Sequence, residues 1–185
     1  TVYFFTGLSG AGKTTIGALF YRRLKEKKPD AILLDGDAVR RMLTGETPVT
    51  LSPEAWNILQ ETVGTARDYT YEGRLRGAWV LFRLCRALAA EGCDVVCCSI
   101  CMYQAVRAWN RENIPHYREI YIKASRETLY RRDQKGLYSS GVKNVVGVDI
   151  PAEEPETPDV VVENDGQNTP LELVLEIERN LVRTT

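Results

Sequence analysis

Gly7-Leu8-Ser9-Gly10-Ala11-Gly12-Lys13-Thr14-Thr15 fits the pattern G-x-x-x-x-G-K-[ST] at every fixed position. An apolar run, Val2 to Phe5, precedes this stretch, and apolar residues at helical spacing follow it. The sequence therefore predicts a strand, a glycine-rich loop and a helix, which is the setting in which this pattern binds phosphate. A Gly- and Ser-rich turn without a ligand is the alternative, and the flanking pattern disfavours it.

The residue types of this loop suit a nucleoside triphosphate. Glycines let successive backbone N–H groups converge on phosphate oxygens, and the N-terminus of the following helix favours negative charge. We expect Lys13 to reach the terminal phosphates and the Thr14 hydroxyl to bind Mg²⁺. The predicted ATP-binding residues of the loop are Gly7, Ser9, Gly10, Ala11, Gly12, Lys13, Thr14 and Thr15.

The composition is that of an ordinary globular domain, with 185 residues, 44% of them apolar and 26% charged. The formal net charge of −1 and the isoelectric point near 5.9 argue against nucleic-acid and membrane-surface partners, which normally demand a basic excess. No stretch of the sequence is long and apolar enough to span a bilayer. We therefore expect a cytoplasmic protein without a nucleic-acid or membrane partner.

The five cysteines gather in one part of the chain, and four of them fall between Cys93 and Cys101. Their odd number argues against a disulfide framework, and the single histidine, His116, leaves too few ligands for a zinc site. We interpret the cysteines as small core residues, with the exception of Cys101, whose position is taken up with the family pattern below.

Predicted strands and helices alternate along the chain, which indicates a parallel sheet with helices on both faces. The predicted fold class is α/β, a P-loop NTPase with a doubly wound parallel five-stranded sheet in a single domain, 1–185. Ligands are expected at the carboxyl ends of the strands. An inserted helix is predicted over 52–66, and the Gly-, Pro- and charge-rich segment 134–156 is predicted to be a mobile lid. The predicted strands are 2–6, 31–35, 93–100, 117–123 and 159–163.

Two carboxylates, Asp35 and Asp37, follow the second predicted strand, at the same edge of the sheet as the glycine-rich loop. A carboxylate there can accept the proton of an attacking hydroxyl or hold Mg²⁺. A pair of turn-forming aspartates around Gly36 is the alternative. The residues by themselves leave both interpretations open.

Three blocks together point to a family. Residues 7–15 read GLSGAGKTT, 34–40 read LDGDAVR, and 132–138 read RDQKGLY, followed by Lys143-Asn144 and Gly147-Val148-Asp149. In this order and spacing the chain resembles the adenylylsulfate (APS) kinase family, from Val2 to about Asn164. Enzymes of that family transfer the γ-phosphoryl group of ATP to the ribose 3′-hydroxyl of APS in sulfate assimilation.

The resemblance implies roles at matching positions. Asp35 would be the base that faces the acceptor hydroxyl and would also hold Mg²⁺ with Thr14, with Asp37 as the alternative base. Arg40 and Arg74 would grip the phosphate side of the acceptor, while Arg132 on the ATP side and Lys135 would lie at the lid edge. The family is commonly dimeric, so a homodimer is an open expectation. The expected acceptor-binding residues are Asp35, Arg40, Tyr69, Arg74, Ile100, Cys101, Gln104, Lys135 and Val145.

The departures from the family pattern gather on the acceptor side. Tyr69 matches one aromatic residue of the family's adenine clamp, but Val145 replaces the second. The family segment S-P-[FY]-R reads Cys101-Met102-Tyr103-Gln104, and a glutamine cannot supply the bidentate charge of an arginine. Gly77 and Trp79 likewise replace an asparagine and an arginine. The donor half looks intact, and the acceptor half looks rebuilt.

Three functions are therefore compatible with the sequence. The leading one is an ATP-dependent kinase of a nucleotide-linked acceptor, with APS as the family default. A kinase of another conjugate, such as cytidine diphosphoramidate, would suit a site that has lost one aromatic wall. An inactive nucleotide-binding regulatory module is the alternative from another class, and retention of Lys13, Thr14, Asp35 and Arg74 argues against it.

Overall fold

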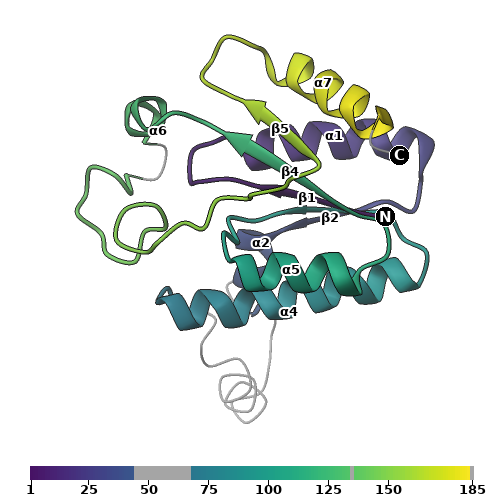
Figure 1. Cartoon of the computed structure of the whole chain (residues 1–185), viewed down its shortest axis with the longest axis horizontal. Coiled ribbons are helices and arrows are strands. Elements are labelled where there is room, and N and C mark those ends of the chain that lie inside the picture. The colour runs from purple at the N-terminus through teal and green to yellow at the C-terminus, as the bar shows by residue number, and fades with distance from the viewer. Residues whose placement is uncertain (44–67, 134–135, 184–185) are drawn as a thin grey trace.

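A parallel five-stranded sheet forms the centre of the computed structural model, which describes residues 1–43, 68–133 and 136–183. The strand order is β2-β3-β1-β4-β5, and every neighbouring pair is parallel (Figure 1). This arrangement confirms the predicted fold class. The strands are β1 (Val2–Thr6), β2 (Ile32–Asp35), β3 (Val95–Cys98), β4 (Tyr117–Lys123) and β5 (Val160–Glu163).

Helices cover both faces of this sheet. In Figure 1, α1 and α7 lie on one face, α2, α4 and α5 lie on the other, and α6 lies at the end of the sheet where the glycine-rich loop is. The helices are α1 (Lys13–Lys27), α2 (Gly36–Leu43), α4 (Tyr71–Ala90), α5 (Gln104–Asn113), α6 (Arg126–Arg132) and α7 (Pro170–Arg183).

The central strands are apolar on both sides because both faces are covered. In β1, Val2 and Phe4 pack into the core beneath α4 and α5, whereas Phe5 packs into the core beneath α1 and α7. Cys97 and Cys98 of β3 divide between the same two cores. Continuous apolar runs in the sequence are the expected signature of such buried parallel strands.

The polar and aromatic residues 67–72 predict a connection, and the pattern that follows predicts a helix from about Arg74. The structure differs from this prediction at the start of α4. The helix begins at Tyr71 because Thr70 caps it, with its hydroxyl accepting a hydrogen bond of 3.2 Å from the Gly73 N–H. Asp68 in turn accepts a hydrogen bond from the Thr70 N–H at 2.9 Å. The predicted helix over 52–66 lies outside the described residues.

All five cysteines are free, as predicted. Cys85, Cys97, Cys98 and Cys101 are buried, and burial raises the pKa of Cys98 and of Cys101 to about 12. Such thiols stay protonated near neutral pH and act as small apolar core residues. The interpretation from sequence is confirmed for Cys85, Cys97 and Cys98, and Cys101, which was excepted from it, is buried as well.

The segment expected to be a lid folds into short turns over its described part, 136–156. Val146 and Ile150 are buried and pack against Met102 and Tyr121. The segment is therefore tied to the core at its centre, and its expected mobility stays a prediction.

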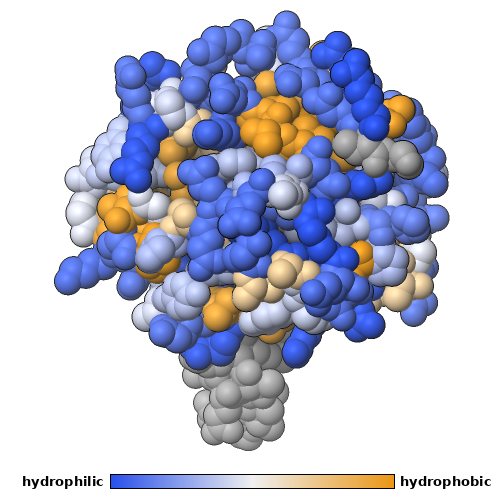
Figure 2. Space-filling model, viewed as in Figure 1, coloured by the Kyte–Doolittle hydropathy of each residue, from blue (hydrophilic) through white to orange (hydrophobic). Residues whose placement is uncertain are grey.

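The face viewed in Figure 2 is mainly polar, with one group of apolar atoms at the left of the view and another near β5 and α7. The exposed large apolar side chains of these two elements include Val161, Leu171, Leu175 and Val182. Among the described helices, none combines the length and apolar character needed to cross a membrane.

Gly17 of α1 sits where the helix packs closely on β3. A Cβ atom at Gly17 would lie 2.3 Å from the Cys98 Sγ and 3.5 Å from the Phe5 ring. We expect Gly17→Ala to lower the free energy of unfolding by about 1–3 kcal/mol, because overpacking outweighs the better helix propensity of alanine. Denaturant titration measures the change.

Gly77 of α4 provides a matched control in an exposed helix interior. A Cβ atom there would meet only the Arg40 Nη2 atom, at 3.6 Å. Gly77→Ala should therefore raise stability by up to about 1 kcal/mol. The double variant Gly17→Ala/Cys98→Ala should recover part of the loss, and equal stability of Gly17→Ala and the parent protein would contradict the close contact.

Candidate active site

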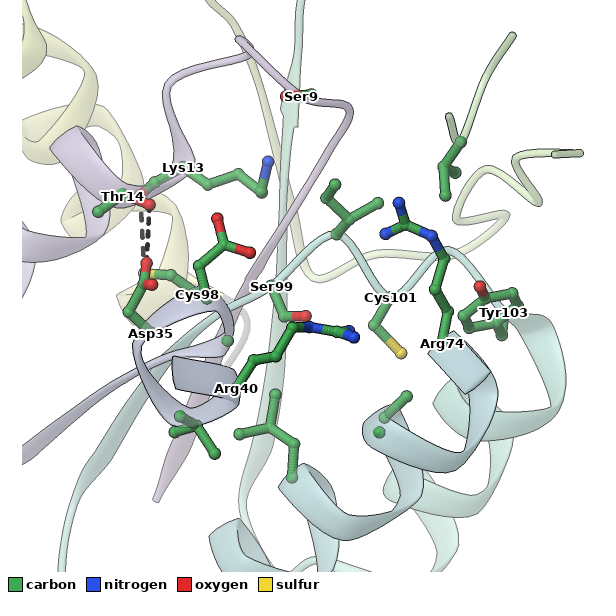
Figure 3. A pocket seen from close by; sticks show the side chains of 18 of the residues that line it. Ser9, Lys13, Thr14, Asp35, Arg40, Arg74, Cys98, Ser99, Cys101 and Tyr103 are labelled. Carbon is green, nitrogen blue, oxygen red and sulfur yellow. Dashed lines mark hydrogen bonds between the residues drawn. The ribbon is translucent and has the colours of Figure 1, made fainter. Parts of the chain in front are cut away.

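One cavity of about 360 Å³ opens at the carboxyl ends of the strands and joins the glycine-rich loop to the space between α2 and α4 (Figure 3). Its position agrees with the expectation for an open α/β sheet. Among the described residues, four cations and two carboxylates line it, and this positive excess suits an anionic ligand. These charged residues are Lys13, Arg40, Arg74, Arg76, Asp35 and Asp37.

The glycine-rich loop owes its shape to its glycines. Gly7, Gly10 and Gly12 have φ angles of 147°, 80° and 100°, which residues with a side chain rarely adopt. A Cβ atom at Gly7 would also lie 2.3 Å from the Ile122 carbonyl oxygen. Lys13 is buried at the start of α1, and its Nζ donates to the Leu8 carbonyl at 2.9 Å. The ammonium group is thereby held against the loop.

Thr14 and Asp35 meet at the edge of the cavity. The Thr14 hydroxyl donates to Asp35 Oδ2 at 2.9 Å, and the Ala38 N–H donates to Asp35 Oδ1 at 3.0 Å (Figure 3). The second contact explains why α2 begins directly after the carboxylate, since Asp35 caps its first turn.

The same pair fits a magnesium ion. A hydroxyl and a carboxylate beside a phosphate loop are ligands that Mg²⁺ uses together with phosphate oxygens and water. No cluster of three or more His, Cys, Asp or Glu side chains suited to a metal occurs among the described residues.

Arg40 and Arg74 point into the other half of the cavity (Figure 3). Their guanidinium carbons lie 4.9 Å and 5.2 Å from the centre of the Tyr69 ring, so both arginines pack against this ring. Burial lowers the pKa of Arg74, which means that its charge is partly stripped of water. An anionic ligand would restore favourable interactions to this guanidinium.

A turn of the 136–156 segment fixes the direction of Arg74. Its Nη2 donates to the Asn144 carbonyl at 2.8 Å, and its Nε donates to the Tyr69 carbonyl at 2.9 Å. The Asp149 carboxylate accepts hydrogen bonds from the N–H groups of Asn144 and Val145, and these bonds lower the pKa of Asp149. Asp149 therefore shapes the turn that presents the Asn144 carbonyl to the arginine.

The structure separates the remaining predicted acceptor residues into two groups. Ile100 and Cys101 line the cavity. Val145 is buried away from the cavity, whose lining includes the neighbouring Val146 instead. Gln104 is exposed, and its Oε1 accepts a hydrogen bond of 2.7 Å from Arg107 Nη2.

Two further predicted residues lie on the outer side of the site. Tyr69 is 49% exposed and contacts the two arginines rather than the cavity itself. Arg132 lies against the glycine-rich loop, where its Nη1 donates to the Gly10 carbonyl at 3.2 Å. Lys135 lies outside the described residues.

Sequence reasoning did not single out three residues of this region. The Tyr103 ring lines the cavity, its hydroxyl has no hydrogen-bond partner among the described residues, and burial raises its pKa to about 12. Tyr138 and Asn164 both contact the glycine-rich loop. Tyr138 belongs to the quoted RDQKGLY block, and Asn164 directly follows the last strand at the ligand-binding edge of the sheet. Both positions could therefore have been named as candidate site residues from the sequence.

A sequence profile described as adenylylsulphate kinase matches residues 1–75 and 57–163 of the chain. The chain belongs to the adenylylsulphate kinase family. It is therefore a phosphotransferase with the P-loop kinase fold, and the resemblance seen in the sequence is confirmed.

Relatives within the family carry different names. The chain is 34% identical over 171 residues to the cytidine diphosphoramidate kinase of Campylobacter jejuni, covering 90% of this chain and 88% of the relative. It is 33% identical over 168 residues to a probable adenylyl-sulfate kinase of Archaeoglobus fulgidus, covering 89% and 96%. The APS kinase of Mycobacterium tuberculosis, solved in complex with AMPPNP and APS, matches with a TM-score of 0.75 and 25% identity over 98% of this chain and 96% of that one.

Proposed function

We propose that this family member transfers the γ-phosphoryl group of ATP to a hydroxyl of a nucleotide-linked acceptor. The observation that carries the proposal is one cavity, in which Lys13, Thr14 and Asp35 lie at one end and Arg40 and Arg74 at the other (Figure 3). Two anionic ligands can therefore meet beside one carboxylate. In-line transfer between two bound ligands needs this arrangement.

The residues divide the work of transfer. The loop N–H groups and Lys13 would bind and neutralise the phosphates of ATP, with the Lys13 ammonium exchanging the Leu8 carbonyl for phosphate oxygens. Mg²⁺, held by Thr14 and Asp35, would supply further neutralisation of phosphate charge. Asp35 would also accept the proton of the attacking hydroxyl, with Asp37 as the alternative base.

APS is the first acceptor that we propose. Arg40 and Arg74 offer two guanidinium groups for its phosphosulfate, and the relative solved with APS aligns over 98% of this chain. The homodimer expected from the family remains a prediction.

A cytidine diphosphate conjugate is the second candidate, and the packing around the arginines favours it. Val145, at the position of the family's second clamp aromatic, is buried outside the cavity lining, and the Tyr69 ring is packed against two guanidinium groups. A purine would therefore find less stacking surface than the family clamp provides. The similarity to the cytidine diphosphoramidate kinase of Campylobacter jejuni agrees with this second candidate.

The acceptor is identified by measuring ATP-dependent ADP release with APS and, in parallel, with cytidine diphosphoramidate. We expect turnover with APS and a higher kcat/KM for APS than for the cytidine compound. The lost stacking contact, worth roughly 1 kcal/mol or about a fivefold factor in affinity, should make this preference for APS smaller than an intact aromatic clamp would give. The opposite preference would establish the second candidate. Binding of ATP without turnover on either acceptor would support the inactive regulatory module instead.

A further inference from the structure

Four successive carbonyl groups of the glycine-rich loop accept hydrogen bonds from side chains. Leu8 accepts from Lys13 at 2.9 Å, and Ser9 accepts from the Tyr138 hydroxyl at 2.8 Å. The Gly10 carbonyl accepts from Arg132 at 3.2 Å, and the Ala11 carbonyl accepts from Asn164 Nδ2 at 2.8 Å. The donors belong to α1, α6, the segment after α6 and the loop after β5, so four parts of the chain converge on one loop.

Hydrogen bonds to these carbonyls also set the direction of the backbone N–H groups on the opposite, phosphate-facing side of the loop, because each peptide unit is planar. In a trans peptide the carbonyl and the next residue's N–H point in opposite directions. Holding the Ser9 and Ala11 carbonyls outward therefore turns the N–H groups of Gly10 and Gly12 the other way. Such N–H groups bind phosphate in this class of loop.

Three contacts hold Tyr138 and its neighbour Ser139 in place, as is expected of a residue that positions the Ser9 carbonyl. Its N–H donates to Asp133 Oδ1 at 2.9 Å, and its ring lies 5.0 Å from the Tyr130 ring. The Ser139 N–H donates to the other oxygen of the same carboxylate at 3.2 Å. With its backbone and ring fixed, Tyr138 delivers its hydroxyl to Ser9 with little remaining freedom.

Asn164 lies directly against the last glycine of the loop. A Cβ atom at Gly12 would lie 2.5 Å from Asn164 Nδ2, so this position needs glycine for space as well as for its φ angle. The backbone N–H of Asn164 donates to the Lys123 carbonyl at 2.7 Å, which holds the residue to β4. The side-chain Oδ1 of Asn164 accepts from Arg132 Nη2 at 3.5 Å, which holds its amide group to α6.

We propose that Tyr138 and Asn164 are positioning residues for the phosphoryl donor, which hold the loop carbonyls outward so that its N–H groups face the phosphates. The inference rests on the proposed function only in taking an adenine nucleotide as donor, and it is independent of the acceptor. It predicts that losing either side-chain bond weakens nucleotide binding without affecting the acceptor site.

Two variants test this role through the dissociation constant for Mg·ADP, measured by calorimetry without any acceptor. Tyr138→Phe removes only the hydroxyl, and Asn164→Ala removes the amide donor. Each should raise the dissociation constant about 3- to 10-fold, the effect of one net hydrogen bond, and the double variant should bind more weakly than either. In turnover assays the KM for ATP should rise while the KM for the acceptor stays unchanged.

Tyr130→Phe is the matched control, because it removes a hydroxyl from the neighbouring, 53% exposed ring and keeps the ring contact. It should leave the dissociation constant for Mg·ADP within about twofold of the parent. The thermal midpoint of the unliganded protein, recorded for all variants, separates a loss of stability from a loss of nucleotide binding. The proposal is overturned by unchanged Mg·ADP affinity in both test variants, whatever the midpoints do, or by an equal loss in Tyr130→Phe.

Discussion

Lys13→Ala should abolish phosphoryl transfer whatever the acceptor, with a loss in kcat/KM of about 10³-fold or more. Lys13 is buried at the start of α1, and its ammonium lies on the loop that would hold the nucleotide phosphates. The Lys13 ammonium would neutralise the negative charge that spreads over the transferred group, and alanine offers no charge in its place. Steady-state ADP release with saturating acceptor measures the loss.

A control variant on the same helix distinguishes loss of the Lys13 charge from loss of folding as the cause of lower turnover. Lys27→Ala removes an exposed lysine from the last turn of α1 and should leave turnover unchanged. Circular dichroism and thermal midpoints of both variants establish that the sheet and helices remain. If a folded Lys13→Ala protein kept its turnover, the proposal that the glycine-rich loop binds the phosphoryl donor would be wrong.

Asp35→Asn should lower kcat by about 10²- to 10⁴-fold while changing the affinity for ATP far less. The amide keeps the shape of the carboxylate and can still accept from the Ala38 N–H, so the start of α2 should persist. It cannot take a proton from the acceptor hydroxyl, and it is a weaker ligand for Mg²⁺ than a carboxylate. Single-turnover rates and nucleotide binding, measured separately, give the two quantities.

Asp37→Asn is the comparison that distinguishes the two candidate bases. Asp37 is exposed, lines the same cavity and lies in the first turn of α2. We expect the smaller effect at Asp37. A larger loss of kcat at Asp37 than at Asp35, with a raised Mg²⁺ requirement only for Asp35→Asn, would assign the base to Asp37 and leave Asp35 as the metal-holding carboxylate.

The donor half of the site could be predicted from the sequence because its chemistry depends on the backbone. Gly10 and Gly12 need φ angles that only glycine adopts easily, and Lys13 and Thr14 follow at a spacing set by the start of the helix. A contiguous motif fixes all of these features at once. The sheet was predictable for a similar local reason, since the buried parallel strands are written as continuous apolar runs.

The acceptor half could be predicted only in part, because its residues come from distant segments. Arg40 and Arg74 were found by resemblance, but their shared contact with Tyr69 depends on how α2 packs against α4. Val145 and Gln104 were expected to face the acceptor, and the fold places them outside the cavity lining. Whether a side chain faces the cavity depends on the direction in which its backbone packs against distant segments, and the local sequence does not specify that direction.

The sequence by itself determined the α/β class, the five parallel strands, the phosphate loop and the carboxylate that ends β2, because short-range patterns specify each of them. Only the tertiary structure showed that Tyr138 and Asn164 hold the carbonyls of that loop and that Asp149 shapes the turn behind Arg74. Those contacts join residues up to 153 positions apart. Hydrogen bonds over such separations form only after the sheet has brought the segments together, so they are properties of the fold.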